Sequence, residues 1–237
     1  MEDLTIDLEE KDSGLLITVD EADPSNKELI KLIATFQHFA REGRHVILVL
    51  AGLPANIDSL VSGKSTSFLR RARKKELSSL TTAQTREALK GTIVMADKDI
   101  EQEALEMVVE AVQGFPYMLQ LVGYEMWTQS IGRDLITVAD AKSAIESALP
   151  ELEQNIYGAT LHELSKKDRE FLKAMLLNPK DSKVSEIAKA MNVSPSYANN
   201  YKRRLMKQGV IHEIAKGYVD FTMPAFREYI ESNIDML

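Results

Sequence analysis

The chain has 237 residues and a net charge of -7, and its 44% apolar content is enough to bury the cores of two or three small domains. It contains no cysteine, which excludes disulfides and thiolate metal sites, and its four His residues are scattered without metal-ligand spacing. Because there is no basic signal-peptide start and no apolar run long enough to cross a bilayer, we expect a cytoplasmic protein without membrane contact.

The first predicted element is a strand over residues 15–19 that ends in two adjacent carboxylates, Asp20 and Glu21. A buried parallel strand is apolar throughout, and its carboxyl end opens into the ligand crevice of an α/β sheet. There Asp20 can bind Mg²⁺, and Glu21 can polarise the water that attacks a γ-phosphate, so both are candidate catalytic residues. The alternative is a strand followed by an acidic helix cap, because residues 23–26 also predict a turn into a helix.

Helical spacing of apolar residues predicts a helix over residues 27–41, and a second buried strand follows over residues 46–51. This order predicts a crossover between parallel strands, with residues 1–80 as part of a P-loop ATPase core. Gly52, which ends the second strand, is a candidate cofactor-binding residue. Only fourteen residues precede the first strand, so we expect the phosphate loop and its strand to be absent. The sheet edge left open would favour pairing with another copy in a homo-oligomer.

Residues 62–66 contain Gly-Lys-Ser, but Asp58 stands where a phosphate loop needs a glycine, so we interpret them as a surface turn. The following run, residues 68–75, is strongly basic. Arg70 and Arg71 are candidate catalytic arginines that would stabilise charge on a γ-phosphate. The favoured alternative is a solvated helix face or a partner for the acidic N-terminal segment.

Residues 81–160 predict a bundle of helices without strands, as in the lid of an ATPase. Trp127 and the Met residues of this segment are expected in its core. Four helices are predicted. Thr82 would cap the first and Asp97 or Asp99 the second, while Pro116 would begin the third and Thr137 the fourth.

Residues 161–237 predict a winged helix-turn-helix domain. Two helices, over residues 168–177 and 184–191, precede a third that Ser194 caps and that runs from Pro195 to Gln208. A hairpin over residues 210–223 follows. The third helix would be the recognition helix, with these candidate DNA-binding residues: Ser196, Tyr197, Asn199, Asn200, Lys202, Arg203, Arg204 and Lys207. The alternative is a dimer or protein contact, with Ala198, Tyr201 and Leu205 on the buried face.

The sequence resembles bacterial and archaeal P-loop ATP-binding proteins of the AAA/STAND type, which are related to origin-recognition ATPases. The resemblance rests on residues 16–21, 50–54, 114–123 and 220–224 together with the terminal winged helix. It implies ATP and Mg²⁺ as cofactors, and a nucleotide-dependent switch coupled to DNA or partner binding. The absent phosphate loop, Gly52 in place of a polar residue, and a lid motif without arginine depart from the family pattern.

These departures predict that the chain as given does not hydrolyse ATP and binds it weakly at best. Two interpretations follow from different classes of protein. The first is the C-terminal portion of an AAA/STAND-type ATPase that couples nucleotide state to DNA or partner binding. The second is a non-enzymatic DNA-binding regulator, or an interaction scaffold, in which the degenerate core only mediates assembly.

Overall fold

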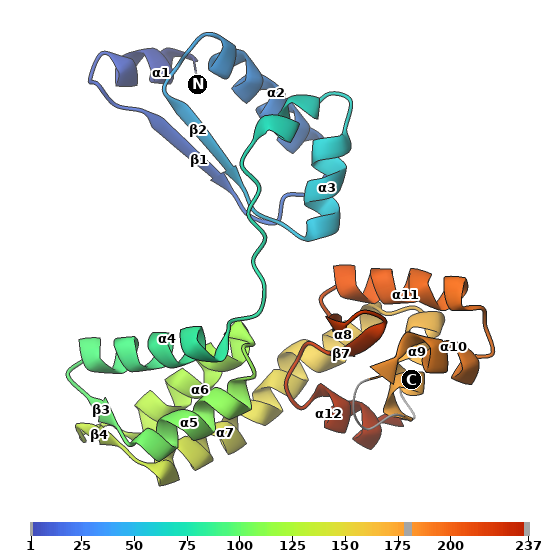
Figure 1. Cartoon of the computed structure of the whole chain (residues 1–237). Coiled ribbons are helices and arrows are strands. Elements are labelled where there is room, and N and C mark those ends of the chain that lie inside the picture. Colours follow the sequence, from blue (N-terminus) through green and yellow to red (C-terminus); the bar gives the residue numbers. More distant parts are fainter. Residues whose placement is uncertain (1, 178–181, 235–237) are drawn as a thin grey trace. The chain divides into compact units, whose positions relative to one another are not determined.

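The computed structural model describes residues 2–177 and 182–234, and the chain divides into two compact units, residues 1–77 and 78–237 (Figure 1). Each unit has its own hydrophobic cluster. In the described ranges, every helix is too short or too polar to span a membrane.

The first unit is built on two parallel strands, β1 and β2, paired from Leu15 opposite Val46 to Val19 opposite Leu50. This pairing confirms the predicted strand–helix–strand order. The connecting helix α2 begins after Asn26, whose Oδ1 accepts the N–H groups of Glu28 (3.0 Å) and Leu29 (3.2 Å). In chain order the elements are α1 (Glu2–Glu9), β1 (Leu15–Val19), α2 (Lys27–Arg41), β2 (Val46–Leu50), α3 (Pro54–Ser62) and the 3₁₀ helix η1 (Ser67–Arg71).

The two faces of this sheet differ in exposure. Val19, Leu48 and Leu50 pack on a core formed by α2, α3 and η1. On the other face Leu16 is 61% exposed and Ile47 is 62% exposed. The prediction that both strands are buried throughout is therefore wrong for this face, because in the described residues no second layer covers it.

The second unit begins with a helical part, as the sequence predicted, but it also contains a short parallel strand pair, β3 with β4. The predicted start at Pro116 and the cap at Thr137 are confirmed. The first helix is capped by the side chain of Thr81, one residue before the predicted cap. The second begins after Glu101, whose side chain makes no capping bond, and not at the predicted Asp97 or Asp99. Its elements are α4 (Thr82–Met95), β3 (Asp99–Ile100), α5 (Gln102–Val112), α6 (Pro116–Gln129), β4 (Leu135–Ile136) and α7 (Val138–Leu152).

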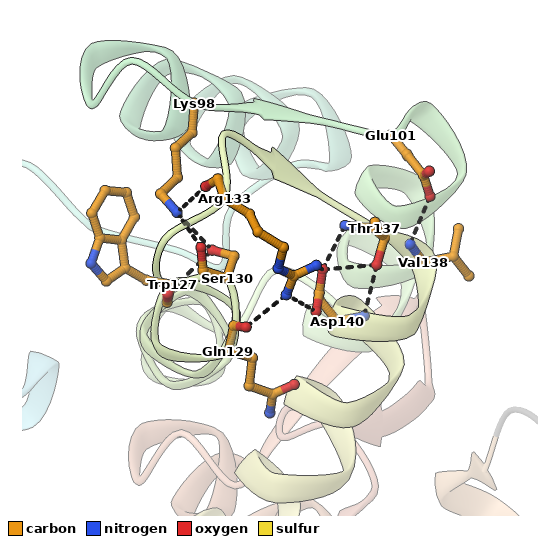
Figure 2. A network of polar contacts seen from close by, with 9 residues as sticks. All are labelled: Lys98, Glu101, Trp127, Gln129, Ser130, Arg133, Thr137, Val138 and Asp140. Carbon is orange, nitrogen blue, oxygen red and sulfur yellow. Dashed lines mark hydrogen bonds and ion pairs between the residues drawn. The ribbon is translucent and has the colours of Figure 1, made fainter.

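Trp127 and Met95 are further corrections, because they lie at the surface and are 41% and 88% exposed, whereas Met118 and Met126 are buried as expected. The Lys98 ammonium lies 4.7 Å from the centre of the indole ring. Lys98 also donates to the carbonyls of Ser130 (2.6 Å) and Arg133 (2.7 Å) (Figure 2). The Lys98 side chain therefore ties α6, and the segment that follows it, to the segment before β3.

Arg133 forms the centre of the same network (Figure 2). Its guanidinium donates to both carboxylate oxygens of Asp140, at 2.6 and 3.0 Å, and to the carbonyl of Gln129 at 2.7 Å. Asp140 also accepts the N–H (2.9 Å) and the hydroxyl (2.8 Å) of Thr137, which completes a capping box at the start of α7. The Arg133 guanidinium, helped by these Thr137 bonds, holds the pKa of the buried Asp140 carboxyl well below its usual range.

This network predicts an acid-dependent loss of stability. Because the folded-state pKa of Asp140 is lowered, its contribution is complete above the unfolded-state pKa, near 3.8, and is lost as the pH falls below that value. Asp140→Asn should lower the free energy of unfolding at pH 7 by about 2 kcal/mol. It should also make stability less dependent on pH in the acid range. Urea titrations followed by the fluorescence of Trp127, the single tryptophan, test this. Equal acid sensitivity of both proteins would contradict it.

The rest of the second unit comprises helices and a three-stranded antiparallel sheet, in which β7 lies between β5 and β6. The predicted third helix, its Ser194 cap and the hairpin are confirmed, whereas β5 was not predicted. The elements are the π-helical segment η2 (Glu153–Tyr157), α8 (Gly158–Glu163), α9 (Lys166–Leu176), β5 (Ser182–Lys183), α10 (Val184–Ala190), α11 (Pro195–Lys207), β6 (Ile211–Ala215), β7 (Tyr218–Phe221) and α12 (Phe226–Ser232).

Candidate functional site

Asp20 and Glu21 lie at the carboxyl end of β1, and both are exposed. The Asp20 Oδ1 accepts the N–H of Glu21 at 2.8 Å, and Glu21 has a left-handed backbone with φ of 51°. This turn places Ala22 in the core, where its N–H donates to the carbonyl of Ala51 at 2.8 Å. The sequence-predicted pair is therefore held at the end of the strand with both carboxylates facing solvent.

Gly52 lies beside the same turn, just beyond β2. A Cβ at this position would lie 3.1 Å from the carbonyl oxygen of Ala22 and 3.2 Å from its nitrogen. The close approach of the two backbones explains a glycine here without any ligand. The predicted cofactor contact of Gly52 stays a prediction.

The residues at this end of the sheet do not fit a nucleotide by themselves. The two loops that leave the strands, residues 20–26 and 51–53, contain three carboxylates and no Lys or Arg. One of these, Asp23, has its pKa lowered by the N–H of Ser25, which donates at 2.8 Å. Mg²⁺ in nucleotide sites needs phosphate oxygens and water in addition to one or two carboxylates. Asp20 could supply one ligand, but this acidic edge repels phosphate.

A larger metal site is not found elsewhere in the described part of the chain. Across residues 2–177 and 182–234, no group of three His, Asp or Glu side chains is arranged to hold a metal ion.

The Gly-Lys-Ser segment is a turn, as predicted. It follows the helix α3 rather than a strand, and Lys64 and Ser65 are exposed. Arg70 and Arg71 belong to η1 and are also exposed, and the Arg70 Nε donates to the carbonyl of Val61 at 3.4 Å. Their proposed action on a γ-phosphate stays a prediction.

The second candidate site is the outer face of α11. Ala198 and Leu205 are fully buried, and they fix which side of the helix faces the core. Helical periodicity of 100° per residue places one row of exposed polar side chains on the opposite side. This row, which we call the α11 row, consists of Ser196, Asn199, Asn200, Arg203 and Lys207.

Two of the predicted DNA-binding cations instead make ion pairs within the domain. Lys202 is only 8% exposed, and its Nζ donates to Glu213 on β6 at 2.5 Å. The Arg204 Nε donates to Asp168 at 2.9 Å, and its Nη2 bonds the same carboxylate. Because these groups already have buried or half-buried acidic partners, we leave both residues out of the α11 row.

Tyr197 lies at the flank of the α11 row and is 41% exposed. Its hydroxyl is 3.0 Å from that of Tyr201, which donates to it, and the two rings are 5.1 Å apart. The guanidinium of Arg204 lies over the Tyr201 ring at 5.3 Å. Tyr197 is therefore ordered by its neighbours but can still reach a ligand.

The sequence prediction missed two exposed lysines outside α11: Lys183, just before α10, and Lys216, in the turn of the hairpin. Composition could have indicated them, because residues 182–217 contain seven Lys or Arg and two Asp or Glu in a chain of net charge -7. A local excess of positive charge in an acidic protein is typical of a surface that contacts phosphate.

Comparisons with known proteins add similarities of fold. A family model described as "Domain of unknown function (DUF8462)" matches residues 154–230. No curated protein matches the sequence. Among solved structures, the chain is similar to the Thermotoga maritima RuvB Holliday junction branch migration motor, with 18% identity, a TM-score of 0.47, and coverage of 91% of this chain and 69% of that one.

Two other solved structures are similar at comparable identity. The Aeropyrum pernix ORC2 protein matches with 13% identity and a TM-score of 0.48, covering 98% of this chain and 69% of that one. The Bacillus subtilis DNA clamp loader delta protein matches with 16% identity and a TM-score of 0.33, covering 81% and 66%. At TM-scores below 0.5 these similarities do not decide function, which rests on the residues of the chain itself.

Proposed function

We propose that residues 161–237 form a winged helix-turn-helix domain that binds DNA, with α11 as the recognition helix and the β6–β7 hairpin as the wing. The observation that supports this is the α11 row, in which hydroxyl and amide groups occupy the N-terminal half and cations follow. Amides and hydroxyls can hydrogen-bond base edges in the major groove, and Arg and Lys can contact bases or phosphates.

We further propose that residues 1–80 are part of an AAA/STAND-type ATPase core and that residues 81–160 are its lid. The parallel pair β1–β2 with Asp20 at its carboxyl end supports this. Because the two loops at this edge, residues 20–26 and 51–53, contain three carboxylates and no Lys or Arg, the chain as given would bind ATP and Mg²⁺ weakly and would not hydrolyse ATP. A non-enzymatic DNA-binding regulator with an assembling core remains the alternative.

The test of DNA binding is the double variant Arg203→Ala with Lys207→Ala in the full chain. Its affinity for a mixed-sequence DNA duplex should fall by about tenfold, and the salt slope should shrink by about 0.9 for each phosphate that the protein no longer neutralises. Fluorescence anisotropy across a salt series measures both. The matched control is Lys142→Ala, which removes an exposed cation from α7. If the double variant and the control bind alike, DNA binding through α11 is refuted.

A further inference from the structure

A small cleft lies beside the α11 row, where the starts of α10 and α11 meet the turn of the hairpin. Its volume is about 220 Å³, and the polar residues that line it are Lys183, Ser185, Asn199 and Lys216. Asn199 also belongs to the α11 row, so the cleft and the row form one continuous surface.

The side chains of the cleft are suited to an anion. The Lys183 ammonium lies over the ring of Tyr218, 5.8 Å from its centre. The Asn199 amide donates one N–H to the carbonyl of Pro195 at 2.9 Å and keeps a second N–H. Ser185 adds a hydroxyl, and Lys216 is exposed at the hairpin turn. Two cations and two neutral donors therefore surround the same small volume.

The carboxylate of Glu213 lies close to the cleft, and its charge is compensated. Glu213 Oε1 accepts the Lys202 Nζ at 2.5 Å and the N–H of Gly217, a cleft residue, at 2.9 Å. These bonds, with Lys202 as the main cause, lower the pKa of Glu213. They also fix the turn that carries Lys216, so the buried Lys202 positions the cleft instead of contacting a ligand.

We propose that this cleft binds one phosphate of the DNA backbone next to the groove that α11 enters. The inference rests on the proposed DNA binding and adds a contact that the recognition helix alone does not provide. Lys183 and Lys216 would pair with the phosphate oxygens, while Ser185 and Asn199 would donate hydrogen bonds to them. Such a contact would fix the position of the domain on the duplex without selecting a base sequence.

The double variant Lys183→Ala with Lys216→Ala tests the cleft in the full chain. For a mixed-sequence DNA duplex we expect the affinity to fall by about tenfold and the salt slope to shrink by about 0.9, the value for one phosphate that is no longer neutralised. Both side chains are exposed, so the thermal unfolding midpoint should not change. Lys189→Ala, an exposed lysine of α10 outside the cleft lining, is the matched control.

The outcomes separate the two proposals. If the Arg203 and Lys207 variant loses affinity while the cleft variant binds like Lys189→Ala, the phosphate cleft is refuted and DNA binding stands. If neither variant differs from its control, the proposed function fails and the cleft proposal fails with it. A double substitution to arginine at positions 183 and 216 should retain the salt slope, since it keeps both charges. A reduced slope in that variant would also count against a phosphate site in the cleft.

Discussion

Replacing Gly114 by alanine should destabilise the second unit by about 3 kcal/mol or more, because the new methyl group meets both backbone strain and a clash. Gly114 follows α5 with φ of 73°, directly after Gln113 with φ of 48°. A Cβ here would lie 2.2 Å from the carbonyl oxygen of Leu80, whose N–H donates to the Gly114 carbonyl at 2.9 Å. The bonded approach of these two backbones leaves no room for a side chain.

Gly91→Ala is the matched control. Gly91 lies inside α4, and a Cβ there would have no neighbour within 4 Å. Alanine should therefore stabilise the helix by about 0.5–1 kcal/mol. Urea unfolding followed by Trp127 fluorescence reports on the unit that contains both glycines. Equal effects of the two substitutions would show that the turn at Gly114 tolerates a side chain.

Replacing Arg204 by alanine should lower the free energy of unfolding by about 2–4 kcal/mol, because it leaves a buried carboxylate without its cation. Asp168 is 1% exposed and caps α9 together with Ser165, whose N–H donates to it at 3.0 Å. Arg204 is its charged partner, and the same interaction raises the pKa of the guanidinium. Arg204→Lys should recover only part of the loss, since an ammonium cannot donate two parallel bonds.

The adjacent residue supplies the control for this prediction. Arg203 is exposed, and its Nη2 donates to the side chain of Asn200 at 2.5 Å. Arg203→Ala should change stability by less than about 0.5 kcal/mol but should weaken DNA binding. Arg204→Ala should lower stability but leave the DNA affinity unchanged, when the affinity is measured at a temperature where the variant stays folded. If Arg204→Ala weakened DNA binding without changing stability, Arg204 would be a DNA contact and not a structural ion-pair residue.

Local signals predicted several of the helix starts, whereas the helices α1, α3, α8 and α12 were not predicted. A hydroxyl at a helix start, as at Thr137 and Ser194, and proline in the first turn, as at Pro116, act through bonds within a few residues and are therefore visible in sequence. Features that depend on residues far apart in the sequence were not predicted. The two-residue strands β3 and β4 pair across more than thirty positions, and no local pattern distinguishes them from loops.

Side-chain roles were harder to predict than elements. Helical spacing alone could have placed Lys202 between Ala198 and Leu205 on the buried side of α11. Its acidic partner Glu213 lies eleven residues away on a strand, and Asp168, the partner of Arg204, lies thirty-six residues away. Every cation of α11 was therefore assigned to DNA from the sequence, although two of these cations form ion pairs within the domain. The strand-end position of Asp20 was predicted, and its binding of Mg²⁺ stays a prediction.

The uncovered face of the β1–β2 sheet has a consequence for how this chain tolerates mutation. Leu16, Ile47 and Val49 are each at least 48% exposed, so they contribute little of the roughly 1.5–3 kcal/mol that full burial of such side chains provides. The folding stability of residues 1–77 by itself therefore does not require apolar side chains at these three positions. Threonine would keep the strand propensity and make the surface more soluble. Among naturally varying copies of this chain, persistent aliphatic residues at these three positions would report a selective pressure other than folding.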